Sequence, residues 1–315
     1  MVAYPPSVPY RLLDHEPPGP GLRRIAVEQI HAATIRLQKC PPDPQEAIHE
    51  VRKRLKKVRA ILRLARGQLG EVLYAGENAR HRDLGRLLAP LRDSHTRLEA
   101  LRGLREQHPA LLAHDAFQGM EELLLADRSR LAAGFSDGEI RRRALSALRG
   151  VDDGPAKWPV DGCSFDALRP GLLRVYRQGR TRMKAAYARP SPDRFHDWRK
   201  RAKYLGYQLR ILEPAWPADL GTTKKTLHDL TTLLGEAHDL SELAVAVRGF
   251  EAPFSNGAQM ELLSTLVAGR CADLHARART LGERVYVEEP EAFVERIALY
   301  WSAWRHHGAS SGASA

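Results

Sequence analysis

Two short basic runs contain the side chains best suited to binding anions. The first begins at His49 and reads HEVRKRLKKVRAILR, and the second begins at His196 and reads HDWRKRAKYLGYQLR. At ~100° per residue around a helix, Arg52, Lys53, Lys56 and Arg63 fall within about 60° of His49, and Arg199, Lys200, Lys203 and Arg210 share a face with His196. The apolar residues fall on the opposite side: Val51, Leu55, Val58 and Leu62 in the first run, and Trp198, Ala202, Leu205 and Leu209 in the second. Each run therefore predicts a helix with one cationic face and one face that enters a core.

The cationic faces have the chemistry of a phosphate-binding surface. Arginine presents a two-pronged donor fork to phosphate, and lysine offers a compact charge that can follow an irregular chain. Like charges one turn apart repel each other, and no acid is expected between them on this face, so a bound anion would offset the repulsion. A solvated basic face is the alternative for one such run, because such faces are common on helices. The same basic face occurs in both runs, and this repetition favours anion binding over the solvated alternative.

The two runs belong to a longer internal repeat. His49, Arg52, Lys53, Lys56 and Arg63 match His196, Arg199, Lys200, Lys203 and Arg210 at one constant offset. At nearly the same offset RDLGRLLAPLRD, residues 82–93, matches HDLTTLLGEAHD, residues 228–239. This match aligns Asp83 with Asp229 and Asp93 with Asp239, and we expect these aspartates to pair with the arginines and orient them. The pattern predicts two versions of one helical unit.

Apolar residues at spacings of three and four predict an all-α chain. We expect helices near 20–39, 44–66, 72–107, 115–133, 137–149, 165–187, 191–213, 217–249, 256–281 and 290–306. The predicted domain organisation is a Pro-rich arm over 1–19, a helical bundle over 20–150, a linker over 151–164, a second helical bundle over 165–306 and a flexible tail over 307–315.

Composition limits the class of partner. The net charge of +11 and the pI near 9.8 favour acidic partners such as nucleic acid, polyphosphate or an anionic membrane face. Cys40, Cys163 and Cys271 are far apart and form no CxxC pair, so the sequence predicts neither a disulfide framework nor a zinc site. The first residues lack a secretion signal, and no long apolar run occurs, so we expect a cytoplasmic protein without a membrane partner.

The repeated motif resembles the CHAD domain, the conserved histidine α-helical domain, over about residues 20–305. The resemblance rests on His49-x-x-Arg52-Lys53-x-x-Lys56, on Leu91-Arg92-Asp93 and on the second copy at His196 to Lys203. It implies two pseudo-symmetric four-helix bundles packed around a basic groove or pore that binds inorganic polyphosphate. By the resemblance, the site is lined by His49, Arg52, Lys53, Lys56, His196, Arg199, Lys200 and Lys203.

Further basic residues extend this candidate site. The rest of the two runs adds Lys57, Arg59, Arg63 and Arg210, and the opening helices of the two halves add Arg23, Arg24, Arg174, Arg177 and Arg180 as secondary candidates. The copies differ, because Tyr204 and Gly206 stand in the second run where the first has Lys57 and Arg59. The two walls of the site are therefore expected to be unequal.

We expect non-catalytic polyphosphate binding without a metal or cofactor, with polyphosphate granules as one location. The histidines are interpreted as structural hydrogen-bonding residues or as phosphate donors that charge near pH ~6.5. Nucleic-acid binding is the main alternative, although the first run has no aromatic residue for base stacking and only Tyr204 and Tyr207 approach the second cationic face. A phosphohistidine-forming or polyphosphate-processing enzyme and a scaffold for acidic proteins are further alternatives. The chain lacks a P-loop, a GxSxG elbow and a kinase signature.

Overall fold

The computed structural model describes residues 9–14, 16–39, 41, 43–113, 115–136, 138–152, 154–249 and 257–311. The regular secondary structure of these residues is helical, without a strand, which confirms the all-α prediction. The helices are α1 (Pro18–Gln38), α2 (Gln45–Leu64), α3 (Arg66–Leu69), α4 (Glu71–Leu87), α5 (Ala89–Gln107), α6 (Asp115–Ser136), α7 (Glu139–Asp152), η1 (Pro155–Lys157), α8 (Phe165–Ala188), α9 (Pro192–Leu212), η2 (Glu213–Ala215), α10 (Pro217–Arg248), α11 (Gly257–Val285) and α12 (Pro290–Ser311).

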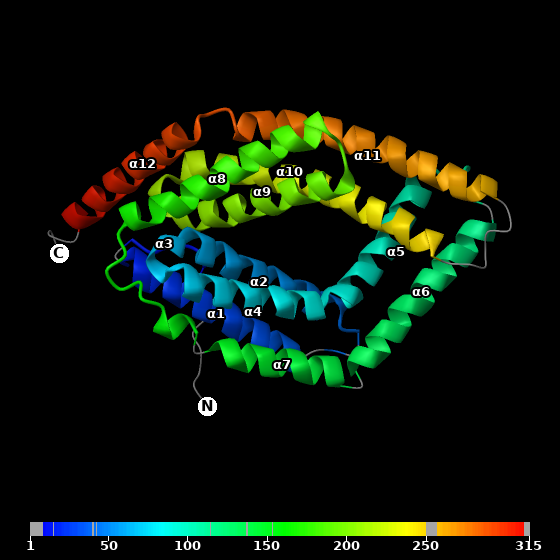
Figure 1. Ribbon diagram of the computed structural model, residues 1–315, viewed down its shortest axis with the longest axis horizontal. Helices are drawn as coiled ribbons and strands as arrows, with labels where there is room; N and C mark the ends of the chain where they lie inside the picture. Colours follow the sequence, from blue (N-terminus) through cyan, green and yellow to red (C-terminus); the bar gives the residue numbers. More distant parts are fainter. Residues whose placement is uncertain are drawn as a thin grey trace.

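Two sets of helices pack side by side (Figure 1). In the first set α1 packs on α2 and α7, and α4 also packs on α2 and α7, which closes a ring of four helices. In the second set α9 packs between α8 and α10, with α12 on α8 and α11 on α10. Helix α2 contacts both α8 and α9, so the helices that carry the two basic runs lie where the two sets meet.

The predicted helix over 72–107 is wrong, because the structure breaks it at Leu88 into α4 and α5. Pro90 lies in the first turn of α5 and lacks the backbone N–H that a continuous helix would need there. The aligned residue of the second copy is Glu236, and α10 runs through it without a break. The break lets α5 turn away from α4 and lie against α10 (Figure 1).

The apolar core forms two clusters, and each draws on both halves of the sequence. The larger cluster contains the predicted apolar faces of α2 and α9, and Val51, Leu55, Leu205 and Leu209 are at most 1% exposed. The smaller cluster joins α5 and α6 to α10 and α11 through residues such as Leu101, Phe117, Leu243 and Leu263. The cores therefore do not follow the predicted division into residues 20–150 and 165–306.

The predicted arm and linker are also built into the fold. Tyr10 and Leu12 are buried in the larger cluster, and the Tyr10 hydroxyl donates to the carbonyl oxygen of Lys57 at 3.0 Å. Trp158 and Val160 bury their side chains in the same cluster. Helix α12 extends to Ser311, into the segment expected to be a tail. Residues 1–8 of the arm and 312–315 of the tail lie outside the described residues.

Candidate anion-binding site

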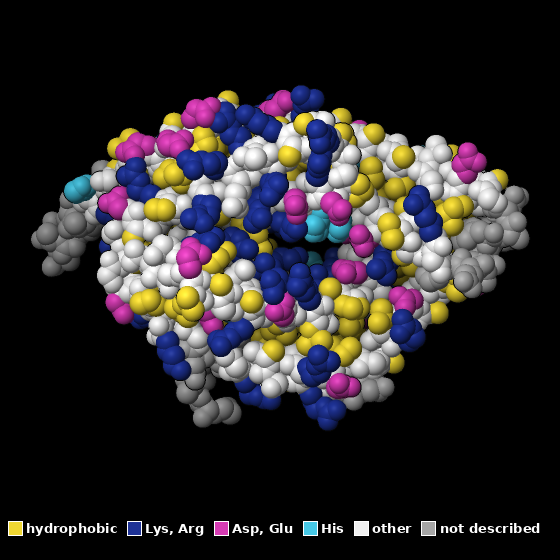
Figure 2. Space-filling model, viewed as in Figure 1, with side chains coloured by type: hydrophobic (Ala, Val, Ile, Leu, Met, Phe, Trp, Pro, Cys, Tyr) yellow, Lys and Arg dark blue, Asp and Glu magenta, His cyan; other side chains and the backbone are white. Residues whose placement is uncertain are grey.

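The basic faces of α2 and α9 meet at the centre of the molecule. Arg52 and Lys56 of α2, Arg199 and Lys203 of α9, and Arg92 of α5 interact electrostatically with one another there, together with Asp93 and Asp239. We call these seven residues the central cluster. Figure 2 shows the face of the molecule hollowed at this place, with Lys, Arg and His side chains gathered in the hollow and some acids at its edge.

Lys56 and Lys203 are the lysines of the central cluster, and their surroundings disfavour the charged form of both. Burial, followed by the charges of Lys203 and Arg199, holds the pKa of Lys56 well below its ordinary value. Burial and then Arg199 lower the pKa of Lys203 to about 7, although Asp239 opposes that effect. Within the described part of the chain, neither ammonium group has an ion pair with a carboxylate. Both lysines are therefore poised to gain from an anion.

Arg52 and Arg199 are fixed by backbone carbonyl groups at aligned positions of the two copies. Arg52 donates to the carbonyl oxygen of Gly85 on α4, and Arg199 donates through Nε to that of Thr231 on α10 at 3.3 Å. A Cβ atom on Gly235 would lie 2.8 Å from the Arg199 guanidinium, so the glycine makes room for this side chain. These contacts orient both guanidinium groups and leave donors for a ligand, since arginine has five N–H groups.

The aspartates of the repeat divide into two kinds. Asp239 is partly buried, which raises its pKa, while Arg199 and Arg92 oppose that effect, and Asp93 acts on Arg52 and Arg92. Within the described residues neither carboxylate forms an ion pair with an arginine, so the expected pairing is not seen at the centre, where the two aspartates act on the arginines electrostatically. Asp83 instead pairs with Arg82 at 2.8 Å on the exposed side of α4. Five basic side chains and two carboxylates thus share the central cluster, which leaves an excess of positive charge.

Lys53 and Lys200, the outer lysines of the two runs, differ from the inner lysines Lys56 and Lys203. Lys53 pairs with Glu50 at 3.1 Å and Lys200 pairs with Asp197 at 2.5 Å, each one turn apart and at aligned positions. The expectation of basic faces without an interleaved acid was therefore wrong. These side chains are 43% and 45% exposed. A ligand at the centre would meet the unpaired Lys56 and Lys203 before it competes for the paired lysines.

Histidines lie beside the cluster and are held neutral. Burial and Arg92 lower the pKa of His49 to about 4, and burial and His238 lower that of His196 to about 3. The rings of His196 and His238 are 4.0 Å apart, and burial lowers the pKa of His238 to about 4. The expectation that these histidines charge near pH 6.5 is wrong for the free protein, because burial and the surrounding cations oppose protonation.

Four further candidates from the basic runs lie beside the centre, not in it. Lys57 is buried over the Tyr10 ring, 4.8 Å from its centroid. Arg59 and Arg63 both donate to Asn78 Oδ1 of α4, at 3.1 and 3.0 Å. Arg210 is exposed and lines a pocket between α9 and α10. Of these four, Arg210 alone is free to extend an anion-binding surface within the described residues.

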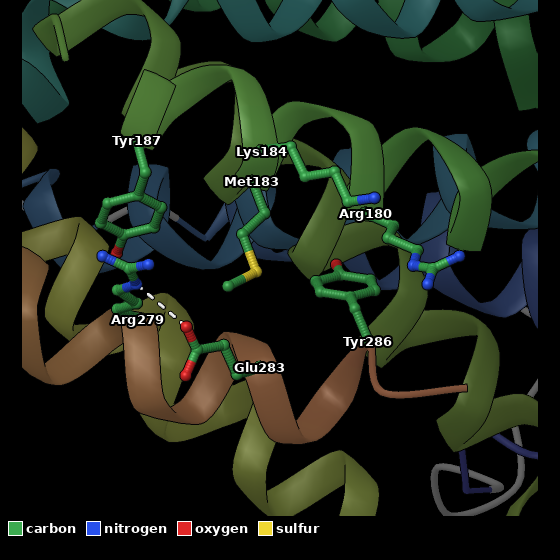
Figure 3. A pocket seen from close by; sticks show the side chains of 7 residues that line it. All are labelled: Arg180, Met183, Lys184, Tyr187, Arg279, Glu283 and Tyr286. Atoms are coloured by element: carbon green, nitrogen blue, oxygen red, sulfur yellow. Dashed lines mark hydrogen bonds and ion pairs between the residues drawn. The ribbon is translucent and has the colours of Figure 1, made fainter. Parts of the chain in front are cut away.

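The secondary candidates point to acids on other faces. Arg23 pairs with Asp161 at 2.8 Å, Arg24 with Glu16 at 2.6 Å, and Arg177 with Glu291. Arg174 acts electrostatically on Glu71 of α4. Arg180 pairs with Glu289 and borders a pocket between α8 and α11, seen in Figure 3 with Met183, Lys184, Tyr187, Arg279, Glu283 and Tyr286. The structure does not bring these five arginines to the central cluster.

Arg92 and His238 are site residues that the candidates from the sequence did not include. Their signal is present in the sequence, because Arg92-Asp93 of one copy aligns with His238-Asp239 of the other. Their distance along the chain from the basic runs hid their proximity to them. Within the described residues, no three His, Cys, Asp or Glu side chains gather closely enough to hold a metal ion, and no helix is both long and apolar enough to cross a membrane.

The sequence model of the CHAD domain matches residues 25–248 of this chain. The chain belongs to the CHAD domain family. The match runs from α1 to the end of α10 and so includes every residue of the central cluster. Among solved structures, this CHAD domain is similar to PptA from Streptomyces chartreusis, with a TM-score of 0.61 and 19% identity over 87% of this chain and 100% of that chain. At this identity the likeness shows the fold alone. No curated protein matches the chain.

Proposed function

We propose that this CHAD domain binds inorganic polyphosphate at the central cluster and does not cleave it. The observation that carries the proposal is the pair Lys56 and Lys203, two partly buried lysines whose charges oppose each other and which form no ion pair with a carboxylate in the described part of the chain. Burying like charges together costs stability unless a counter-charge is present. A chain of phosphates supplies that counter-charge at many points, and so it suits a cluster contributed by α2, α5 and α9.

The surroundings of the cluster favour a ligand that consists only of phosphates. Proteins that bind single-stranded nucleic acid stack bases on exposed aromatic rings. The Tyr204 ring is buried beneath Arg63, with the guanidinium carbon 3.9 Å from the ring centroid. Tyr207 packs edge-on against Tyr10. The buried Tyr204 ring therefore offers no free face to a base, which supports binding through phosphate alone.

The protonation of His49 and His196 is expected to change when an anion binds. His49 and His196 are neutral in the free protein because burial and nearby cations lower their pKa values. An anion beside them would raise these pKa values, so phosphate binding at mildly acidic pH would be coupled to proton uptake. In this proposal the histidines are donors to phosphate and form no phosphohistidine. Binding of this kind would place the protein on polyphosphate granules.

The proposal is tested by titrating long-chain polyphosphate, single-stranded DNA and heparin at equal charge concentration and equal salt. We expect polyphosphate to bind at least tenfold more tightly than DNA, a difference of ~1.4 kcal/mol. Equal or tighter binding of DNA would contradict the proposal. Incubation with polyphosphate and magnesium should release no orthophosphate. Release above that of a His49→Ala/His196→Ala double variant would instead show an enzyme.

A further inference from the structure

A pocket of about 340 Å³ between α9 and α10 adjoins the central cluster. It is lined by Ala202, Lys203, Gly206, Tyr207, Arg210, Lys224, Lys225, Leu227, His228 and Thr231. Lys203 belongs to both the cluster and the pocket, and Thr231 is the residue whose carbonyl oxygen holds Arg199. The pocket is therefore a continuation of the centre toward the outside.

The cations of this pocket continue those of the centre. Along α9 the residues from Lys203 to Arg210 span about 10 Å at ~1.5 Å per residue. Arg210 and Lys225 are exposed and have no ion pair within the described residues. Lys224 is neutralised by its ion pair with Glu213. An anionic chain leaving Lys203 would therefore find two unpaired cations farther out.

Two residues that line this opening are replaced by larger or polar residues in the first copy of the repeat. Gly206 aligns with Arg59, which fills the space between α2 and α4 and donates to Asn78 Oδ1 at 3.1 Å. Leu227 aligns with His81, which is 1% exposed and has Nδ1 2.8 Å from the carbonyl oxygen of Glu77. The residue types that differ between the copies thus fill the space between α2 and α4 and leave space between α9 and α10.

Packing does not explain why position 206 is a glycine. A Cβ atom there would have Leu227 Cβ as its nearest neighbour at 3.7 Å, which is an ordinary contact. Gly206 lies inside α9, where alanine is the better helix former, and its φ is not positive. The space that glycine leaves is therefore available to a ligand.

We infer that the α9–α10 pocket is an exit groove for the polyanion, so that a chain held at the centre continues past Gly206 to Arg210 and Lys225. The inference rests on the proposed function and adds a direction to it. A short polyphosphate occupies the centre alone, whereas a long one also fills the groove. The groove then adds affinity for long chains through a second set of contacts at high local concentration.

The test uses Gly206→Leu, a neutral plug, with long-chain polyphosphate and tripolyphosphate as ligands. We expect long-chain affinity to fall at least tenfold, which is ~1.4 kcal/mol, and tripolyphosphate affinity to stay within about twofold. The matched control is Gly76→Leu, because Gly76 is an exposed helical glycine of α4 with nothing within 4 Å of its Cβ position. The control should bind both ligands like the wild type.

A second variant keeps the test independent of helix packing. Arg210→Gln/Lys225→Gln changes only exposed side chains, and it should make the salt dependence of long-chain binding shallower while that of tripolyphosphate stays unchanged. Unchanged long-chain binding in both variants, or an equal loss of affinity for both ligands, would overturn the inference of an exit groove. Failure of the wild type to bind either polyphosphate would overturn the proposed function itself.

Discussion

Replacing Lys203 by methionine should stabilise the free protein. Burial and Arg199 lower the pKa of Lys203 from its ordinary value of 10.5 to about 7. At ~1.36 kcal/mol per pKa unit, keeping this lysine charged costs roughly 5 kcal/mol. Allowing for the remaining solvent contact of the side chain, we expect Lys203→Met to raise the free energy of unfolding by about 2–4 kcal/mol at pH 6. This gain exists only while no anion occupies the cluster.

The sign of the pH dependence follows from the lowered pKa. Between about pH 7 and pH 10.5 the unfolded chain holds a proton on Lys203 that the folded protein has lost. Wild-type stability should therefore rise as the pH increases through this range, and it should carry the full cost below pH 7. The methionine variant lacks this titration. The difference in stability between the two proteins should be largest near pH 6 and should shrink toward pH 10.

The assay is urea denaturation at pH 6, 8 and 10 after bound anions are removed by a high-salt wash. A thermal melt at pH 6 should show the variant at least about 4 °C above the wild type, taking ~2–4 °C per kcal/mol. Added polyphosphate should stabilise the wild type more than the variant, because only the wild type gains the counter-charge. A variant that is less stable than the wild type at pH 6 would refute the reasoning, since Lys203 would then be stabilising in the free protein.

Three further predictions concern binding and packing. Lys56→Gln and Lys203→Gln should weaken polyphosphate binding, measured by titration, more than Lys53→Gln and Lys200→Gln do, because only the outer lysines have an acid partner. Equal losses of affinity would argue against the central cluster as the binding site. Wild-type affinity should fall from pH 7 to pH 10 as Lys203 loses its proton, and Lys203→Arg should bind with a flatter pH profile, since arginine stays charged. Gly171→Ala should cost about 1–3 kcal/mol in urea denaturation, because its Cβ would lie 2.1 Å from the carbonyl oxygen of Leu64, whereas Gly103→Ala, with no atom within 4 Å, should not destabilise.

The sequence predicts well what depends on local periodicity. The apolar faces of α2 and α9 are confirmed, because the helical period alone determines which residues share a face. The break before Pro90 was missed, since the apolar spacing continues through it. The interleaved acids Glu50 and Asp197 were also missed, because a flexible side chain one turn away can reach a lysine from outside the basic face.

What the sequence could not predict depends on tertiary contacts. That Lys56 and Lys203 lie near each other follows from the packing of α2 on α9, and no pattern within either run indicates it. The lowered histidine pKa values likewise come from burial and from Arg92, His238 and other groups of the assembled site. The acid partners of Arg177 and Arg180 lie on a segment more than a hundred residues later in the chain.

The sharing of both apolar clusters between the two halves has a consequence for synthesis on the ribosome. Helix α2 ends at Leu64, but α9, whose apolar residues join the same cluster, ends at Leu212. At ~5–20 residues per second, roughly 7–30 s pass between the emergence of the two helices. During this interval the apolar residues of α2 that pack against α9 in the finished fold lack part of their final neighbours. The nascent N-terminal half is therefore a natural client for a chaperone, and a chain truncated before α8 should aggregate instead of folding as an independent domain.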